Sequence, residues 1–235
     1  MAGGNRTAGD QKTMHDRDVR RAMWTWLHDN WAKENGSPDQ YLFTNEFVVS
    51  AECRSDIAII GRDLMEGFEL KSASDTLDRL PNQVVEYSKV FDRCSVVLSA
   101  DKMRAVDMVP SWWGVYRADM AEDGRTTITR LRKPEENHQQ DALSLAHLLW
   151  KSEALHVLEE RHADKGVRSK NRAFLWERMV ETIPVAELGG IVRRVLLARD
   201  DWRTSVWDSD KPGVATSVGV KVNGLRQNGA LDFRP

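Results

Sequence analysis

The first part of the chain carries hydrophobic residues at helical spacing. Val19, Met23 and Leu27 recur at every fourth position and therefore share one face of a helix. This pattern predicts a helix from Asp16 to about residue 35, where the sequence Gly-Ser-Pro ends it. Residues 41–49 are interpreted as a second, short helix.

The next segment alternates between strand-like and helical patterns. The sequence SDIAIIGRDLMEGFELK predicts a β-hairpin, because a turn-like Gly-Arg-Asp separates two apolar runs. Since strands and helices then alternate, we expect an α/β fold with a small mixed central sheet flanked by helices. The further strands are predicted at 94–99, 112–119 and 126–133, and the helices between them at 81–91 and 101–109.

Only helical spacing is found between residues 141 and 202. This stretch predicts three helices, with Ser169 as the N-cap of the second and Pro184 separating the second from the third. The predicted organisation has four parts: a disordered N-terminal tail (1–15), an α/β core (16–134), an all-α subdomain (135–203) and a flexible C-terminal tail (204–235).

The amino-acid composition and net charge exclude several classes of protein. Hydrophobic residues make up 41% of the 235 positions, which is enough for a core, and the formal net charge of −2 indicates no overall attraction to nucleic acid. Cys53 and Cys94 are too few for a disulfide scaffold or a structural zinc site. The sequence has neither a secretory signal nor an apolar run approaching the ~20 residues that span a bilayer. We therefore expect a cytoplasmic protein that does not enter a membrane.

The sequence GFELKS, residues 67–72, places Glu69 and Lys71 on one face of a buried strand. Asp56 opens the preceding strand of the hairpin and is expected to lie beside Glu69. Gln83 and Tyr87 are four residues apart and so share one side of the following helix. Two carboxylates and a base on neighbouring strands are the groups needed for metal-assisted hydrolysis of a phosphodiester. A structural ion pair on a half-exposed strand is the alternative.

These residues resemble the motifs of the PD-(D/E)xK nuclease superfamily. Asp56 followed by Glu69-Leu70-Lys71 resembles the PD-(D/E)xK motif itself, with Ser55 in place of proline. The sequence QVVEY, residues 83–87, resembles the QxxxY motif of the RecB-like branch. The segment from about 40 to 117 is also similar to a group of uncharacterised bacterial and phage proteins. The resemblance implies a restriction-endonuclease-like core.

The resemblance also implies a Mg²⁺ site, in which Mn²⁺ would act as a substitute. Asp56, Glu69 and the main-chain carbonyl of Leu70 would hold the metal ion. In many members a helix before these strands adds an acidic ligand, and Glu46 is the candidate for this role, with Glu52 as a weaker one.

The same resemblance assigns catalytic roles around the metal site. Lys71 would orient the attacking water or neutralise charge on the phosphate, and Gln83 and Tyr87 would support the site. Many members of the superfamily form dimers, so a homodimer is possible.

Contacts with nucleic acid are expected from side chains near the predicted site and from one distant loop. Arg54 and Arg79 flank the site and either grip phosphate or pair with acids such as Asp75, while Ser72 either binds phosphate or faces away. The loop before the helix at 169–182 is basic, which favours phosphate binding or, equally, a solvated helix connection. Its candidate residues are Lys165, Arg168, Lys170 and Arg172.

The sequence therefore predicts a metal-dependent nuclease, acting on DNA more than on RNA. The alternative is a catalytically inactive protein on the same fold that binds nucleic acid or acts as an adaptor.

Overall fold

A computed structural model describes residues 13–37, 40–199, 205–206 and 216–217. Its main feature is a six-stranded mixed sheet with strand order β1-β2-β3-β4-β5-β6. The strands pair antiparallel, except that β4 runs parallel to both β3 and β5. The strand bounds are β1 Leu42–Ser50, β2 Cys53–Ile60, β3 Met65–Lys71, β4 Arg93–Ser99, β5 Gly114–Met120 and β6 Thr126–Arg132.

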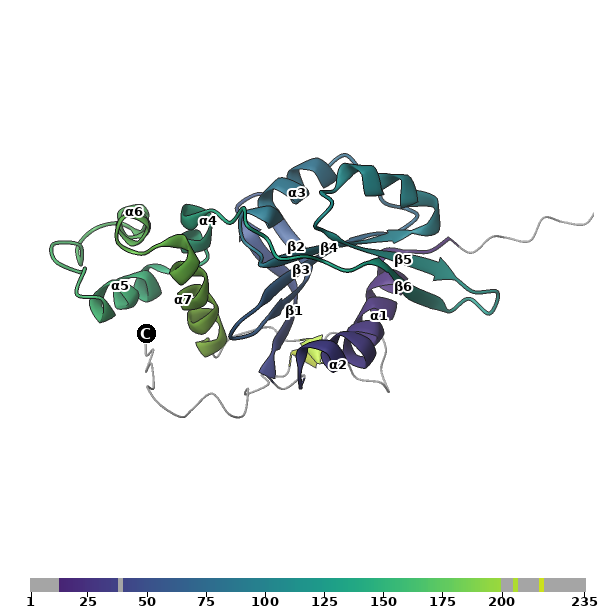
Figure 1. Ribbon diagram of the computed structural model, residues 1–235, viewed down its shortest axis with the longest axis horizontal. Coiled ribbons are helices and arrows are strands. Elements are labelled where there is room, and N and C mark those ends of the chain that lie inside the picture. Colours follow the sequence, from purple (N-terminus) through teal and green to yellow (C-terminus); the bar gives the residue numbers. More distant parts are fainter. Residues whose placement is uncertain (1–12, 38–39, 200–204, 207–215, 218–235) are drawn as a thin grey trace, which may run out of the picture.

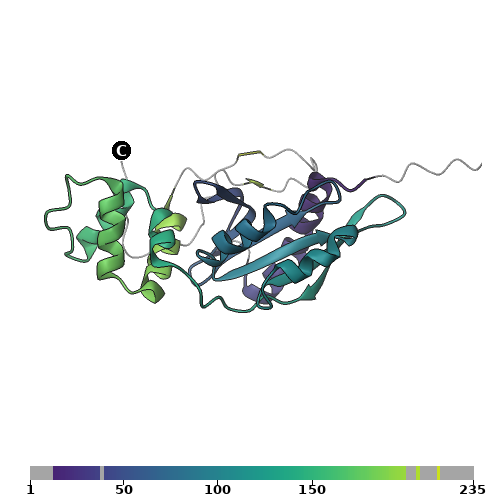
Figure 2. The same cartoon turned by 90° about the horizontal axis from the view of Figure 1, so that it is seen from above.

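Helices cover both faces of this sheet (Figures 1 and 2). On one face lies the N-terminal helical segment, made of α1 (Asp16–Trp26), the π-helix η1 (Leu27–Trp31) and α2 (Ala32–Asn35). On the other lie α3 (Leu80–Ser88) and the 3₁₀-helix η3 (Ala100–Met108). The predicted α/β class, with helices on a mixed sheet, is confirmed.

The predicted short helix over residues 41–49 is wrong, because this segment is strand β1. Glu46 adopts a left-handed backbone conformation with φ of 53°. Leu42 and Thr44 are buried before it and Phe47 and Val49 after it, so the buried positions change from even to odd numbers. This change of phase hides the alternation by which a strand is recognised in sequence.

The helical periodicity after residue 141 is confirmed, but its division differs. The first predicted helix is two helices, because Leu148 to Trp150 separate α4 from α5. The side chain of Asn171, not that of Ser169, caps α6 by accepting a hydrogen bond from the Phe174 N–H at 3.0 Å. The helices are α4 Ala142–His147, α5 Lys151–Glu160, α6 Arg172–Thr182 and α7 Val185–Ala198.

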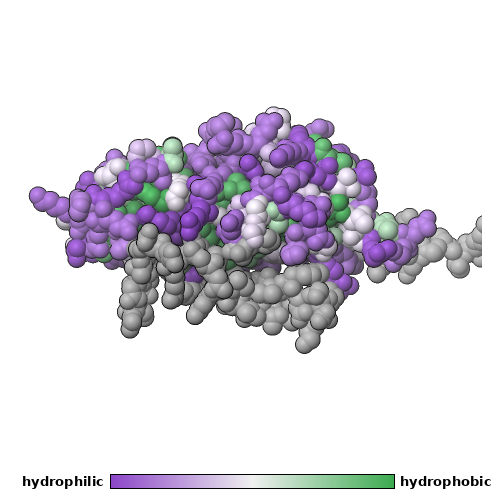
Figure 3. All heavy atoms as spheres, turned by 60° about the horizontal axis from the view of Figure 1, so that its bottom comes forward, coloured by the Kyte–Doolittle hydropathy of each residue, from purple (hydrophilic) through white to green (hydrophobic). Residues whose placement is uncertain are grey.

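The C-terminal helices share a hydrophobic core with the sheet. One continuous cluster of buried residues includes Phe47 and Ala58 from the sheet and Leu188 and Ile191 from α7. The second cluster packs α1 against the opposite face of the sheet. The protein surface seen in Figure 3 is mostly hydrophilic, with hydrophobic residues in small separate areas. None of the described helices is long and apolar enough to cross a membrane.

An ion pair fastens α7 to the loop between α3 and β4. The guanidinium of Arg193 donates from Nη1 to both carboxylate oxygens of Asp92, at 2.8 and 2.9 Å. Asp92 in turn accepts a hydrogen bond from the Met65 main-chain N–H at 2.6 Å. This contact ties the helical part to the start of β3, the strand that carries Glu69 and Lys71.

Both predicted tails fall mainly outside the described residues. Residues 1–12 are not described, and within 204–235 only Ser205–Val206 and Thr216–Ser217 are, as the paired short strands β7 and β8. Cys53 and Cys94 are buried and free, as expected for a chain without a disulfide scaffold.

We expect Gly67→Ala to destabilise the protein by about 1–3 kcal/mol, because it overpacks the core. A Cβ on Gly67 would lie 2.4 Å from the ring of Phe91, which is fully buried. Urea unfolding of Gly67→Ala, Phe91→Leu and the double variant measures this. The double variant should lose less than the sum of the two single losses, and strictly additive losses would show that the two side chains do not conflict.

Candidate active site

A cleft of about 520 Å³ opens between α1, the β1–β2 hairpin, β3 and the N-terminal part of α3. The predicted metal ligands and catalytic residues, with the exception of Tyr87, line this cleft. Its lining residues are Asp16, Arg20, Glu46, Ala51, Glu52, Cys53, Arg54, Asp56, Glu69, Leu70, Lys71, Asp75, Arg79, Asn82 and Gln83.

Glu69 and Lys71 form a buried ion pair at the end of β3. The strand places them on one face, while Phe68 and Leu70 face the opposite way and pack beneath α1. Lys71 Nζ donates to Glu69 Oε1 at 2.7 Å, and both side chains are almost fully buried, at 3% and 2% exposure. The ion pair of the alternative interpretation is present, but its expected place on a half-exposed strand is wrong, because every residue of β3 is buried and the pair borders only the cleft.

Helix α3 contributes the two polar side chains predicted from the QxxxY motif. Gln83 Oε1 accepts a hydrogen bond from Lys71 Nζ at 3.0 Å. The Tyr87 hydroxyl donates to Glu69 Oε2 at 2.5 Å and lies 3.2 Å from the main-chain oxygen of Arg54. Because Tyr87 is fully buried and bonded to Glu69, it supports the site from behind.

Asp56 lies beside Glu69 on the neighbouring strand, as the hairpin pattern predicts. The register pairs Ile57 with Phe68, so that the preceding residue of β2 falls opposite the following residue of β3. Asp56 Oδ2 accepts the Leu70 main-chain N–H at 2.8 Å. This bond fixes the carboxylate at the point where β2 and β3 part.

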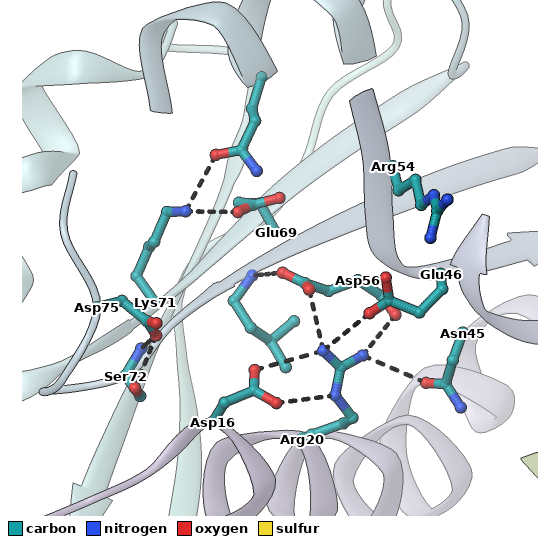
Figure 4. A network of polar contacts seen from close by, with 12 residues as sticks. Asp16, Arg20, Asn45, Glu46, Arg54, Asp56, Glu69, Lys71, Ser72 and Asp75 are labelled. Carbon is teal, nitrogen blue, oxygen red and sulfur yellow. Dashed lines mark hydrogen bonds and ion pairs between the residues drawn. The ribbon is translucent and has the colours of Figure 1, made fainter. Parts of the chain in front are cut away.

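Two residues of α1 complete the site and were missed in the sequence. Arg20 Nη2 donates to Asp56 Oδ1 at 2.9 Å, and Arg20 Nε donates to Asp16 Oδ2 at 3.2 Å (Figure 4). Their spacing of four residues in a predicted helix was the available signal. The helix that precedes the strands therefore does bring an acid to the cleft, but that acid is Asp16.

Glu46 reaches the cleft from β1 and not from a helix. Its side chain is 57% exposed, and its Oε1 lies 3.4 Å from Arg20 Nη2. The left-handed backbone of Glu46 is a conformation that non-glycine residues seldom adopt, and such outliers gather at functional sites. Glu52, the weaker candidate, is also exposed on the lining of the cleft.

Burial and neighbouring charge make Glu69 hard to ionise. Desolvation, followed by the charge of Asp56, raises the pKa of Glu69 from 4.5 to about 7, although Lys71 and Tyr87 oppose this change. Desolvation also raises the pKa of Asp56, against the opposing effects of Arg20 and the Leu70 N–H. A divalent cation in the cleft would favour the ionised form of both carboxylates.

The predicted nucleic-acid contacts near the site divide into two groups. Arg54 and Arg79 are exposed on the cleft lining, and in the described part of the chain neither forms an ion pair with Asp75 or any other acid. Ser72 is fully buried, and its hydroxyl donates to Asp75 at 2.6 Å. Ser72 therefore stabilises the turn after β3 in place of the predicted contact with nucleic acid.

The basic loop before α6 lies in the helical part, away from the cleft lining. Arg168 pairs with Glu159 at 2.8 Å and with Asp164 at 3.2 Å. Lys170 and Arg172 lie over aromatic rings of α6, those of Phe174 and Trp176. Lys165 is exposed. Since three of the four cations already have partners, the geometry favours a solvated helix connection over a phosphate site.

The donor atoms of the cleft suit a hard cation. No three His, Cys, Asp or Glu side chains among the described residues are grouped as they would be around a metal ion. Magnesium, however, commonly uses one or two carboxylates together with water and substrate phosphates. Asp56 and Glu69 supply two, each carboxylate oxygen accepts one of the hydrogen bonds above, and each keeps a further lone pair. These residues therefore fit Mg²⁺ or Mn²⁺.

Comparisons with known proteins place the chain in a phage family. A solved structure of a protein of unknown function from Silicibacter pomeroyi is 16% identical, with a TM-score of 0.40, over 69% of this chain and 99% of that one. No curated protein matches the chain. The family model described as bacteriophage P4 protein cII matches residues 15–211, which include every helix and strand from α1 to α7. Since this match spans most of the sequence, the chain belongs to the bacteriophage P4 protein cII family.

Proposed function

We propose that this protein is a metal-dependent nuclease that hydrolyses phosphodiester bonds, with DNA as the favoured substrate. The observation that carries the proposal is the convergence of Asp56, Glu69 and Lys71 in one cleft, supported from behind by Gln83 and Tyr87. The succession of helix, strands, helix and strand around these residues also agrees with the restriction-endonuclease-like core implied by the sequence motifs.

In this proposal Asp56, Glu69 and the Leu70 carbonyl hold the metal ion, and Glu46 or Asp16 completes its surroundings. When bound, Mg²⁺ or Mn²⁺ would supply an acidified water and charge stabilisation at the phosphate.

Lys71 is placed to act on the water or on the phosphate. Its ammonium group has three N–H donors, of which Glu69 and Gln83 accept two. The third is available to a water or to a phosphate oxygen in the cleft. Because the ammonium group is held on two sides, little reorganisation is needed when negative charge develops on the phosphate.

Two exposed arginines provide further groups that could bind the substrate. Arg54 and Arg79 lie on the lining of the cleft, without acidic partners among the described residues. A guanidinium in this position can bind a phosphate through two parallel N–H bonds. These two residues are therefore the proposed contacts with the nucleic-acid backbone.

One observation favours the alternative of a catalytically inactive protein that binds nucleic acid. Each central carboxylate already has a cationic partner, because Asp56 pairs with Arg20 and Glu69 pairs with Lys71. If Arg20 and Lys71 occupy these carboxylates in place of a metal ion, the protein would keep its fold and its nucleic-acid-binding surface but would not cleave the substrate.

A cleavage panel separates the two functions. Single-stranded, duplex and branched DNA and a matched RNA are incubated with the protein in Mg²⁺, Mn²⁺ or EDTA. We expect cutting that requires metal and that Asp56→Asn reduces on the order of 10²-fold or more, as loss of a transition-state contact does. The control is Glu122→Gln, an exposed acid in the β5–β6 turn. Binding without cutting under every condition would support the inactive alternative.

A further inference from the structure

The side chain of Arg20 lies at the centre of a group of polar side chains in the cleft, those of Asp16, Asn45, Glu46 and Asp56 (Figure 4). Its Nη1 donates to the main-chain oxygen of Asp56 at 2.7 Å, and its Nη2 donates to the Asp56 carboxylate at 2.9 Å. The same guanidinium contacts Asp16, Glu46 and Asn45 at 3.2–3.5 Å. A guanidinium has only five N–H donors, so these contacts use all of its capacity.

The charges around Arg20 do not balance. Within this group, one guanidinium faces three carboxylates, those of Asp16, Glu46 and Asp56. Glu69 and Lys71 next to it cancel one another. The cleft centre therefore carries a formal charge of −2, which is the charge that one divalent cation would neutralise.

Arg20 also has a second acidic partner, Asp16, on its own helix. Asp16 lies one turn earlier on the same helix and is 47% exposed, so this pair does not depend on the sheet. If Arg20 released Asp56, its guanidinium would keep Asp16 and would not be left unpaired. The Asp56 carboxylate would then need another cation, because its side chain is only 21% exposed and an unpaired charge at a partly buried position is costly.

From this geometry we propose that Arg20 is a resident counterion that competes with divalent metal for Asp56. This inference rests on the proposed function, because it concerns the same metal site. While Arg20 holds Asp56, it stabilises the metal-free protein and lowers the affinity for metal. On metal binding Arg20 moves onto Asp16, and the metal concentration needed to fill the site is set by this exchange.

The test is direct binding of Mn²⁺, followed by electron paramagnetic resonance and calorimetry, to wild type, Arg20→Gln and Arg17→Gln. We expect Arg20→Gln to bind Mn²⁺ about tenfold more tightly, since a charge-assisted competitor is removed. Arg17→Gln is the control, because Arg17 lies on the same helix but is 82% exposed, and its ion pair among the described residues is with Asp18, at 3.8 Å, and not with an acid of the cleft. Its affinity should match that of wild type.

Thermal unfolding adds a readout that does not depend on activity. In EDTA, Arg20→Gln should melt below wild type, because Asp56 loses its cation, and Mn²⁺ should raise its melting temperature more than that of wild type. If Arg20→Gln does not fold, Arg20→Lys keeps the charge but lacks the fork that spans Asp16 and Asp56, and it should bind Mn²⁺ more tightly than wild type.

The outcomes distinguish this inference from the proposed function. Equal Mn²⁺ affinity in wild type and Arg20→Gln, or weaker binding by the variant, would overturn the competition while leaving a metal site in place. No Mn²⁺ binding by any of the proteins would overturn both, and Arg20 would then be a structural counterion only.

Discussion

Replacing Lys71 with methionine should cost the metal-free protein about 3–5 kcal/mol of its free energy of unfolding. Lys71 and Glu69 are both nearly inaccessible to solvent, so the substitution leaves a buried carboxylate without its cation. Breaking a buried ion pair from one side typically has an effect of this size. Urea unfolding in EDTA measures it, at a pH well above the wild-type Glu69 pKa of about 7, because loss of Lys71 raises this pKa further.

The double variant Glu69→Gln/Lys71→Met should recover part of this loss, because no buried charge is then unpaired. Lys89→Met is the matched control: Lys89 also pairs with a glutamate, at 2.6 Å, but is 39% exposed. Its loss should stay below about 1 kcal/mol. A Lys71→Met loss as small as that of the control, or additive losses in the double variant, would contradict the buried pair.

The metal-free protein should become less stable as pH rises toward neutrality, with Glu69 contributing about 3 kcal/mol to the change. In the unfolded chain this carboxyl titrates near its ordinary pKa of 4.5, whereas burial raises its pKa in the folded protein to about 7. Between these values the folded state holds a proton that the unfolded state has lost. Stability therefore falls as pH rises through this range, and the size follows from the pKa difference.

Glu69→Gln isolates this contribution, because other acids, such as the partly buried Asp56 and the fully buried Glu66, also have raised pKa values and change stability in the same direction. Unfolding free energies of wild type and Glu69→Gln, measured in EDTA across this pH range, should diverge. The slope of the variant should be shallower. Identical slopes would show that Glu69 titrates normally in the folded protein.

Much of the fold follows from local patterns. The hairpin of β2 and β3 was predictable because two apolar runs flank a polar turn, and the partnership of Asp56 with Glu69 follows from its register. The strand at 42–50 was not predictable in the same way, because Glu46 turns the chain out of phase at its centre. Sequence periodicity cannot distinguish a strand with a left-handed residue from a short irregular helix.

The candidate site was predictable where its residues are close in sequence or carried by a motif. Glu69, Lys71, Gln83 and Tyr87 meet through adjacent elements, β3 and α3. Arg20 was not predictable, because it reaches Asp56 across 36 positions and depends on how α1 packs on the sheet. Long-range packing of this kind leaves no periodic signal in the sequence.

The most direct test of the proposed nuclease compares cleavage and Mn²⁺ binding in wild type, Glu69→Gln and Lys71→Met, on the substrate that wild type cuts best. Wild type should bind Mn²⁺ and cut, and Glu69→Gln should lose both properties. Lys71→Met should bind Mn²⁺ at least as tightly as wild type, yet cut at least about 10²-fold more slowly. Cutting by Glu69→Gln at the wild-type rate would contradict the assignment of this cleft as the catalytic centre.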